Sequence, residues 1–210
     1  MRSILSAVVI AGTVLLSGCG YNTMQAQDVD VQGKWSKVLN EYQRRADLIP
    51  NIVKMVEAEA NFEKDVLTQV TQARASVAGI KATPELVNDP VAFQKFIAAQ
   101  NQLQGSLSRL MVVSENYPNI KANQAFHDAR VTLEGSENRI TTARNDYINS
   151  VQQYNTTIRV FPSNLTAKVI GLKPKANFSV TNEAELSAAP KIEINTNSAP
   201  KLPAPAPVKP

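Results

Sequence analysis

Several kinds of residue are scarce in this chain of 210 residues, and each scarcity excludes a class of protein. There is one cysteine, Cys19, and one histidine, His127. This excludes a disulfide framework and a Cys/His zinc site, and it argues against an ordinary His-based catalytic triad. A di-iron bundle needs Glu-x-x-His on two helices, but the residue three positions before His127 is Gln124. We therefore expect no metal and no cofactor.

Glycine and aromatic residues are also few, with eight glycines and 6% aromatics. Between positions 34 and 170 the only glycines are Gly79, Gly105 and Gly135. So little glycine argues against a turn-rich all-β fold. Positive charge is also limited, since residues 28–170 hold 16 Lys and Arg against 15 Asp and Glu. No basic stripe is visible in that region, so we expect no nucleic-acid partner.

The N-terminus has the pattern of an export signal. Arg2 precedes an apolar run of 13 residues from Ile4 to Leu16, which is shorter than the ~20 residues of a transmembrane helix. The run ends in Leu16-Ser17-Gly18-Cys19, which resembles a bacterial lipobox. This pattern predicts that residues 1–18 are removed as a signal peptide and that Cys19 carries lipid. A plain signal peptide followed by a free thiol is the alternative, and a free thiol is unexpected on an exported protein.

Lipid on Cys19 predicts an exported protein that is anchored to the membrane of the cell envelope. One acyl chain binds a membrane only marginally, whereas two or three hold a protein there stably. Residues 19–27 are then a short, polar, lipidated tether. Residue 20 is Gly rather than the Asp that usually accompanies retention at the inner membrane. If the source has two membranes, this favours the outer one.

From Val31 onward, apolar residues recur at alternating steps of four and three, which predicts helices. Arg45, Glu59 and Glu63 interrupt this stripe in its own register. Asp47 fits an N-cap and Pro50 fits the first turn of a helix, so either two helices meet here or one helix kinks. The unbroken phase favours the kink and the capping pattern favours the turn, which is our preferred interpretation.

The second half of the chain has two further helical stripes. Gly79 to Pro90 is a loop, and Tyr117-Pro118-Asn119 separates the next helix from a long one over about 121–160. The long helix carries a large residue every seven positions, namely Phe126, Leu133, Ile140, Tyr147, Tyr154 and Phe161. Beside them runs a row of small residues, Ala122, Ala129, Ser136, Ala143 and Ser150. Residues 28–170 are therefore predicted to form an all-α, antiparallel, up-and-down bundle of four long helices, or of three if the first two are one helix.

Residues 171–210 differ in composition from the predicted bundle and are predicted to be extended to disordered. Six of the twelve prolines lie in residues 187–210. Such a Pro-rich and Lys-containing segment buries no core of its own. It serves either as a solvated end or as a docking arm for an envelope partner.

Four segments resemble the LemA family of bacterial envelope proteins and together cover about residues 22–178. They are Arg44–Asn51, Glu115–Asn123 with Phe126, Leu133–Ile140 with Arg144 and Tyr147, and Tyr154-Asn155 with Phe161–Asn164 and Gly171. The resemblance implies a helical bundle on an N-terminal membrane anchor, without an established enzymatic activity. Phe62-Glu63 stands where the family often has His-Glu, and Tyr147-Ile148 where it often has Tyr-Asn.

Charged residues near the predicted helix seams are the candidate site. Arg130, Glu137 and Arg144 repeat every seven positions beside the stripe of the last helix, and Glu63 and Glu115 are candidate partners for Arg144. Such a polar layer either fixes helix register or binds a ligand or partner. The complete candidate set is Glu63, Glu115, Arg130, Glu137, Arg139, Arg144 and Tyr147.

These observations predict a non-enzymatic structural or adaptor lipoprotein that contacts other envelope proteins. A slim bundle has little room for a sugar cleft, which argues against a glycosidase-type carboxylate pair. The alternative function is a binding module that holds a lipid or another apolar ligand between its helices.

Overall fold

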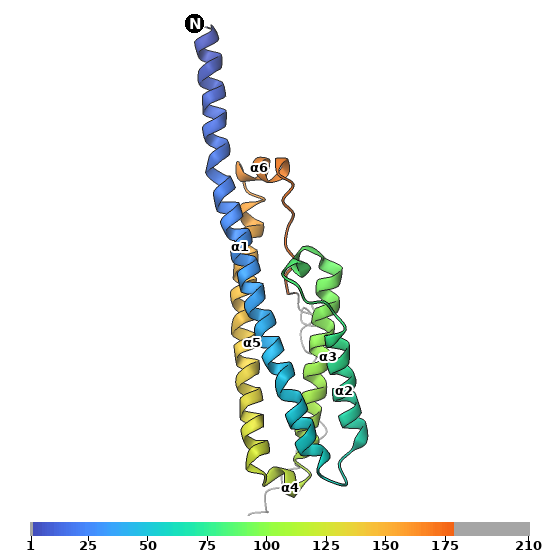
Figure 1. Ribbon diagram of the computed structural model, residues 1–210. Coiled ribbons are helices and arrows are strands. Elements are labelled where there is room, and N and C mark those ends of the chain that lie inside the picture. The colour runs from blue at the N-terminus through green and yellow to red at the C-terminus, as the bar shows by residue number, and fades with distance from the viewer. Residues whose placement is uncertain (1, 179–210) are drawn as a thin grey trace, which may run out of the picture. The chain divides into compact units, whose positions relative to one another are not determined.

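The computed structural model describes residues 2–178, with side chains from residue 20 onward. Helices are the regular secondary structure of these residues and no strand occurs among them, so the all-α prediction is confirmed. The elements are α1 (Arg2–Glu57), α2 (Lys64–Ala78), the 3₁₀ helix η1 (Pro84–Asn88), α3 (Pro90–Ser114), α4 (Pro118–Lys121), α5 (Gln124–Thr157) and α6 (Ser163–Val169) (Figure 1).

Helix α1 passes through Pro50 without a turn, so the preferred interpretation of two helices meeting there is wrong. Asp47 does not cap a helix but accepts a hydrogen bond from the Gln43 side chain within α1. Proline removes one backbone hydrogen bond from a helix interior. Ile49, Ile52 and Val56 are buried around it, and their continuous apolar stripe compensates for the lost bond.

The first helix instead ends at Glu57, and a turn over residues 58–63 leads into α2. Backbone bonds from Glu59 N to Val56 O and from Phe62 N to Glu59 O close this turn. The prediction that Glu59 and Glu63 lie within a continuing helical stripe is therefore wrong, because Glu59 lies in the turn and Glu63 is the N-cap of α2. The buried Phe62 ring packs on Tyr117 and anchors the turn.

Helices α1 and α5 pack along one another, and α2 packs on α3 (Figure 1). The ion pairs between α1 and α5 show their relative direction. Lys37 pairs with Asp146, Glu41 with Arg139, and Arg45 with Glu137. Because the residue number in α5 falls as the number in α1 rises, these two helices run in opposite directions.

Two apolar clusters fill the space between the helices. One surrounds Trp35, which contacts the rings of Phe93, Phe96, Tyr147 and Phe178. The other joins the last turns of α1 to α2, α3 and the first half of α5. The predicted stripe of α1 supplies both clusters, since Val31, Trp35, Val38, Tyr42, Ile49, Ile52 and Val56 are all buried.

The long last helix is shorter than the predicted 121–160. The short α4 precedes it, and Asn123 caps α5 by accepting a hydrogen bond from Phe126 N. Five of the six predicted large residues are buried, but Phe161 is 79% exposed because it lies beyond the end of α5. In the row of small residues, Ser136, Ala143 and Ser150 are buried, Ala129 is half-buried and Ala122 is exposed.

At both ends, the packed region extends beyond the predicted bundle of residues 28–170. Residues 20–27, the predicted tether, continue α1, and Met24 is buried. Residues 172–178 have no regular secondary structure and lie against the bundle, where Ala176 N donates to Val87 O and Lys175 pairs with Asp28. The predicted Pro-rich tail, residues 187–210, lies outside the described residues.

Candidate functional site

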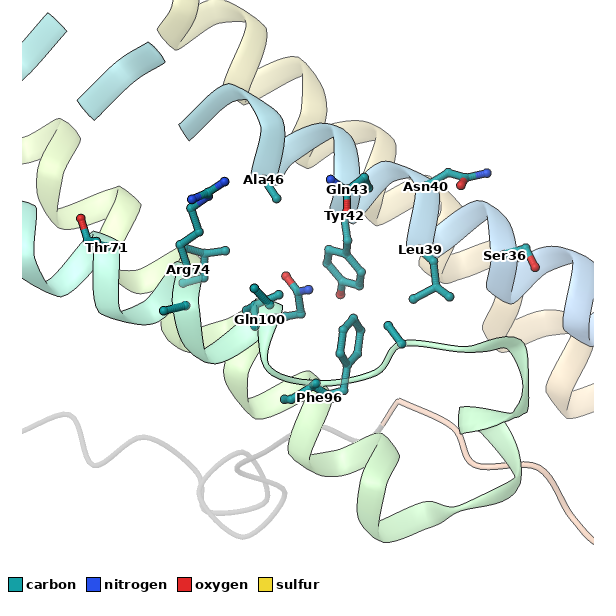
Figure 2. A pocket seen from close by; sticks show the side chains of 16 residues that line it. Ser36, Leu39, Asn40, Tyr42, Gln43, Ala46, Thr71, Arg74, Phe96 and Gln100 are labelled. Atoms are coloured by element: carbon teal, nitrogen blue, oxygen red, sulfur yellow. The ribbon is translucent and has the colours of Figure 1, made fainter. Parts of the chain in front are cut away.

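A groove of about 680 Å³ runs between α1 and α2, and α3 forms its floor (Figure 2). Leu39 and Ala46 line it from α1, Val77 from α2, and Phe96 and Leu103 from α3. Its volume lies within the range of pockets that hold small molecules. The groove is therefore the candidate site for a ligand with a substantial apolar part.

Polar side chains from all three helices also line this groove, among them Tyr42 from α1, Arg74 from α2 and Gln100 from α3. Figure 2 shows the Tyr42 ring and the Gln100 amide at the floor, next to Phe96. Tyr42 packs edge-on against Phe96, with the ring centroids 5.6 Å apart. Burial raises the pKa of Tyr42 above its ordinary value, although Arg144 and Arg45 partly oppose this by favouring the phenolate. The Tyr42 hydroxyl therefore stays protonated at neutral pH.

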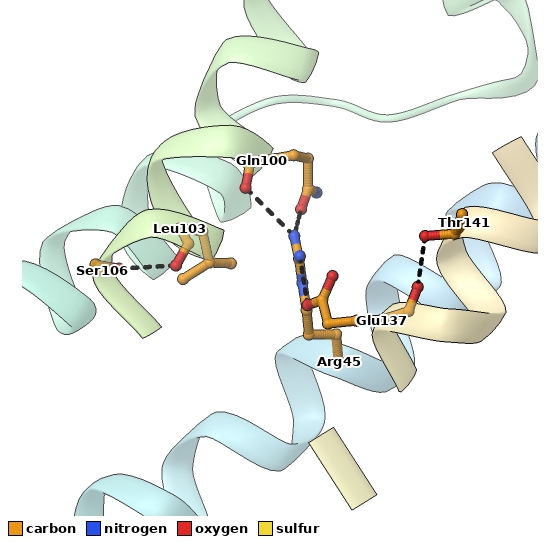
Figure 3. Close-up of polar contacts among 6 residues, drawn as sticks. All are labelled: Arg45, Gln100, Leu103, Ser106, Glu137 and Thr141. Carbon is orange, nitrogen blue, oxygen red and sulfur yellow. Dashed lines mark hydrogen bonds and ion pairs between the residues drawn. The ribbon is translucent and has the colours of Figure 1, made fainter. Parts of the chain in front are cut away.

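A polar network centred on the buried Arg45 is drawn in Figure 3, and it adjoins the groove through Gln100. Arg45, only 1% exposed, donates from Nη1 to Glu137 Oε1 at 2.8 Å. Its Nη2 donates to the side-chain oxygen of Gln100 and to the backbone oxygen of Gln100 at 3.4 Å. Arg45 also lies over the Tyr42 ring, 5.2 Å from its centroid. One guanidinium thus joins α1, α3 and α5 to each other.

Gln100 belongs to both features, because its side chain accepts from Arg45 and also lines the groove. The Nε of Arg45 is buried and has no hydrogen-bond partner among the described atoms. Since a buried charge is costly unless it is paired, the network depends on Glu137 and Gln100 together. A ligand that displaced the Gln100 side chain would loosen the contacts of Arg45.

The sequence prediction missed Arg45 and Gln100 as members of the site. A signal for Arg45 was present, because it occupies the register of the apolar stripe of α1 between Tyr42 and Ile49. A charged residue at such a position either marks a break in the stripe or lies buried against a partner. The partner here is Glu137, which belongs to the predicted set and lies ninety-two positions away in the sequence.

The other predicted site residues do not gather at the groove. Glu115 pairs with Arg130 and with Lys121, and Arg130 also pairs with Glu134, all at the surface near α4. Hydrogen bonds from Lys121, and then from Arg130, lower the pKa of Glu115 below its ordinary value. Arg139 pairs with Glu41 at 3.3 Å.

Arg144 does not pair with Glu63 or Glu115, so the suggested partners are wrong. Glu63 is an exposed N-cap and Glu115 lies beside Arg130. Arg144 is half-buried and lies over the Phe178 ring, 4.3 Å from its centroid. Tyr147 is fully buried, and its hydroxyl donates to Ala176 O at 2.6 Å. Both side chains therefore hold residues 171–178 onto the bundle.

Residues 34–194 match the LemA family. This chain belongs to the LemA family. Its relatives include Magnetosome protein MamQ 2 of Paramagnetospirillum magneticum, which is 29% identical over 81% of this chain and 68% of the relative. Magnetosome protein MamQ of Magnetospirillum gryphiswaldense is 27% identical over the same shares of the two chains.

In this LemA-family chain, the buried network joins two of the segments that resemble the family. Arg45 lies in the segment Arg44–Asn51, and Glu137 lies in the segment Leu133–Ile140. Within residues 20–178, the part of the chain whose side chains the structure describes, no group of three or more His, Cys, Asp or Glu side chains is arranged to hold a metal ion. Over residues 20–178 no helix combines the length and the apolar character needed to cross a membrane.

Proposed function

We propose that this LemA-family protein is a lipid-anchored, non-enzymatic adaptor of the bacterial cell envelope. The observation that carries the proposal is the apolar run that ends in Leu16-Ser17-Gly18-Cys19. Membership of the LemA family, and the naming of its relatives as magnetosome proteins, support a membrane-associated role. The four long helices act as one antiparallel, up-and-down bundle that presents its surfaces to other envelope proteins.

The position of Cys19 supports an anchor that is joined rigidly to the bundle. Gly20 lies against α6, since a Cβ at this position would stand 3.0 Å from the Ser163 hydroxyl oxygen. Met24, one turn further along α1, is fully buried. Lipid on Cys19 would therefore hold this end of the bundle directly at the membrane, without a long flexible spacer.

A Cys19→Ser variant tests the anchor. We expect the wild-type protein to incorporate labelled palmitate and to sediment with membranes. The variant should lose the label and should either leave the membrane fraction or accumulate with its signal uncut. A variant that keeps both the palmitate label and its membrane association would overturn the proposal. Ser17→Ala, a change to another small residue, is the matched control and should behave as the wild type.

Affinity capture after crosslinking in intact cells tests the adaptor role. We expect wild-type protein to recover specific envelope proteins that a Cys19→Ser variant does not, because only the anchored form is held beside them. Recovery of the same proteins with both forms would argue against an adaptor role that depends on the anchor.

The groove favours a second candidate function, the binding of an amphiphile. Leu39, Val77 and Phe96 would contact an apolar chain, and Tyr42 and Gln100 would contact a polar group. A few convergent polar groups in an apolar pocket are typical of ligand sites. Native mass spectrometry of the purified protein should then detect a retained small molecule.

Two matched substitutions sharpen this test. Ala75 lines the groove and is exposed, so Ala75→Trp would fill the groove without disturbing the core. Ala98 is exposed on α3 and does not line the groove, so Ala98→Trp is the control. We expect Ala75→Trp alone to lose the ligand. Equal retention by both variants would exclude the groove as the binding site.

A further inference from the structure

Large exposed hydrophobic side chains are concentrated at one end of α5 and on α6. Ten such residues are exposed among the described side chains, and five of them lie within residues 160–170. We call these five the α6 cap: Val160, Phe161, Leu165, Val169 and Ile170. Single exposed hydrophobic residues are ordinary, but a group this close together marks an interaction surface.

The geometry of α6 directs part of this cap outward. Leu165 and Val169 are four residues apart and share one face of α6, where they are 56% and 86% exposed. Ala167, on the opposite face, is buried against the bundle. Phe161, just before α6, is 79% exposed. The packing of α6 on the bundle therefore uses its small residue and leaves its large ones outside.

The α6 cap lies beside the predicted lipid anchor. Helix α6 packs against α1, and the contact includes Gly20 and Ser163. Figure 1 shows α6 across the end of α5, at the level from which α1 continues toward the N-terminus. Cys19 is the residue next to Gly20 in the chain. An acyl group on Cys19 would bring the bilayer to this end of the bundle.

The segment of chain that carries the cap holds basic side chains and no acidic ones. No Asp or Glu occurs between Asp146 and Glu183, whereas this stretch contains Arg159, Lys168, Lys173 and Lys175. Lys175 is paired with Asp28. Arg159, Lys168 and Lys173 are exposed. Basic side chains around an apolar surface complement the anionic headgroups of a bilayer.

We infer that the α6 cap is a membrane-contact surface that enters the headgroup region of an anionic bilayer. Phe161, Leu165 and Val169 contact the upper part of the acyl chains, while the basic side chains lie at the level of the phosphates. The inference rests on the proposed anchor at Cys19, because that anchor holds the cap against the lipid. It adds an orientation, in which the end of the bundle at α4 points away from the membrane.

Depth-dependent fluorescence tests this contact in the full chain. The protein is reconstituted into phosphatidylcholine–phosphatidylglycerol vesicles with or without brominated acyl chains, and the tryptophan of a Phe161→Trp variant is compared with wild type. The only native tryptophan, Trp35, is fully buried and provides a constant background. We expect the emission of the new tryptophan to shift to the blue and to be quenched by bromine. Emission that is the same in both kinds of vesicle would overturn the inference.

Val112→Trp is the matched control. Val112 is 71% exposed and lies in the last turn of α3, which leads into α4. Figure 1 shows α4 and α6 at opposite ends of the bundle. The tryptophan at position 112 should show neither a shift nor quenching. Equal quenching at both positions would overturn the inference, because the protein would then lie along the bilayer or bind it without orientation.

A second measurement separates this inference from the anchor itself. Mass spectrometry of the reconstituted protein reports whether Cys19 is acylated, and an unmodified Cys19 would refute the anchor alone. The cap is then judged from the protein that floats with the vesicles. Quenching at position 161 in that fraction supports the inference, and either unquenched emission or the absence of floating protein overturns it.

Discussion

Two arginines, each paired with a glutamate, occupy contrasting regions of this protein. Arg45 is 1% exposed and binds Glu137 next to the groove, whereas Arg130 is 42% exposed and binds Glu115 at the surface near α4. Both pairs are in direct hydrogen-bond contact. Their energetic roles differ because water screens both partners of the second pair, whereas in the first pair the Arg45 guanidinium is shielded from water. The comparison teaches that burial, rather than contact geometry, decides what an ion pair contributes.

Removing the carboxylate from the buried pair should have the largest effect. Glu137→Ala leaves the Arg45 guanidinium buried with Gln100 as its remaining partner, and we expect a loss of about 3 kcal/mol in the free energy of unfolding. Urea denaturation measures this loss. Glu134→Ala, three residues earlier on α5, removes only an exposed contact to Arg130 and is the matched control. Equal losses for both variants would contradict the contrast between the regions.

A double variant sharpens the same prediction. Replacing Arg45 with Met in the Glu137→Ala background removes the buried charge and keeps much of the side-chain volume. We expect the double variant to recover most of the lost stability, since an apolar side chain needs no partner in that position. If stability falls further, the aliphatic packing of Arg45 or its bonds to Gln100 matter more than its charge.

Arg144 should show an intermediate effect. It is half-buried and stacks on Phe178 rather than pairing with a carboxylate. Arg144→Ala should therefore cost about 1 kcal/mol, which thermal or urea unfolding can resolve. In a Phe178→Leu background the ring is absent, so the same substitution should cost clearly less. An unchanged cost in that background would show that the stacking contact is not the source.

Glu115 should show the smallest effect and a dependence on salt and pH. The pKa of Glu115 is lowered in the folded state by its hydrogen bonds to Lys121 and Arg130. The stability from this carboxylate is therefore present above its unfolded pKa and is lost as the pH falls through the lower, folded pKa. Thermal melts should show a small difference between wild type and Glu115→Gln near neutral pH. This difference should fade in acid and at high salt, whereas persistence at high salt would contradict a screened surface pair.

The sequence by itself determined most of the core of this protein. Its period of three and four along α1 predicted the buried residues from Val31 to Val56, and the period of seven along α5 predicted Phe126, Leu133, Ile140, Tyr147 and Tyr154. The reason is that the helical repeat is a local property, so any residue on the apolar face is buried when helices pack together. The same logic failed for Phe161 because the helix had already ended.

Only the tertiary structure decided which polar groups meet. Arg45 and Glu137 lie in different helices, and their contact depends on the stagger of α1 against α5, which loops and side-chain packing set. The passage of α1 through Pro50 was decided in the same way, because the burial of Ile49 and Ile52 outweighs a local signal for a turn. The Phe178 ring contacts Trp35, Phe93 and Tyr147, which belong to three different helices. These contacts form only once the three helices have packed together. Local periodicity selects the buried faces, and the packing of those faces selects the partners.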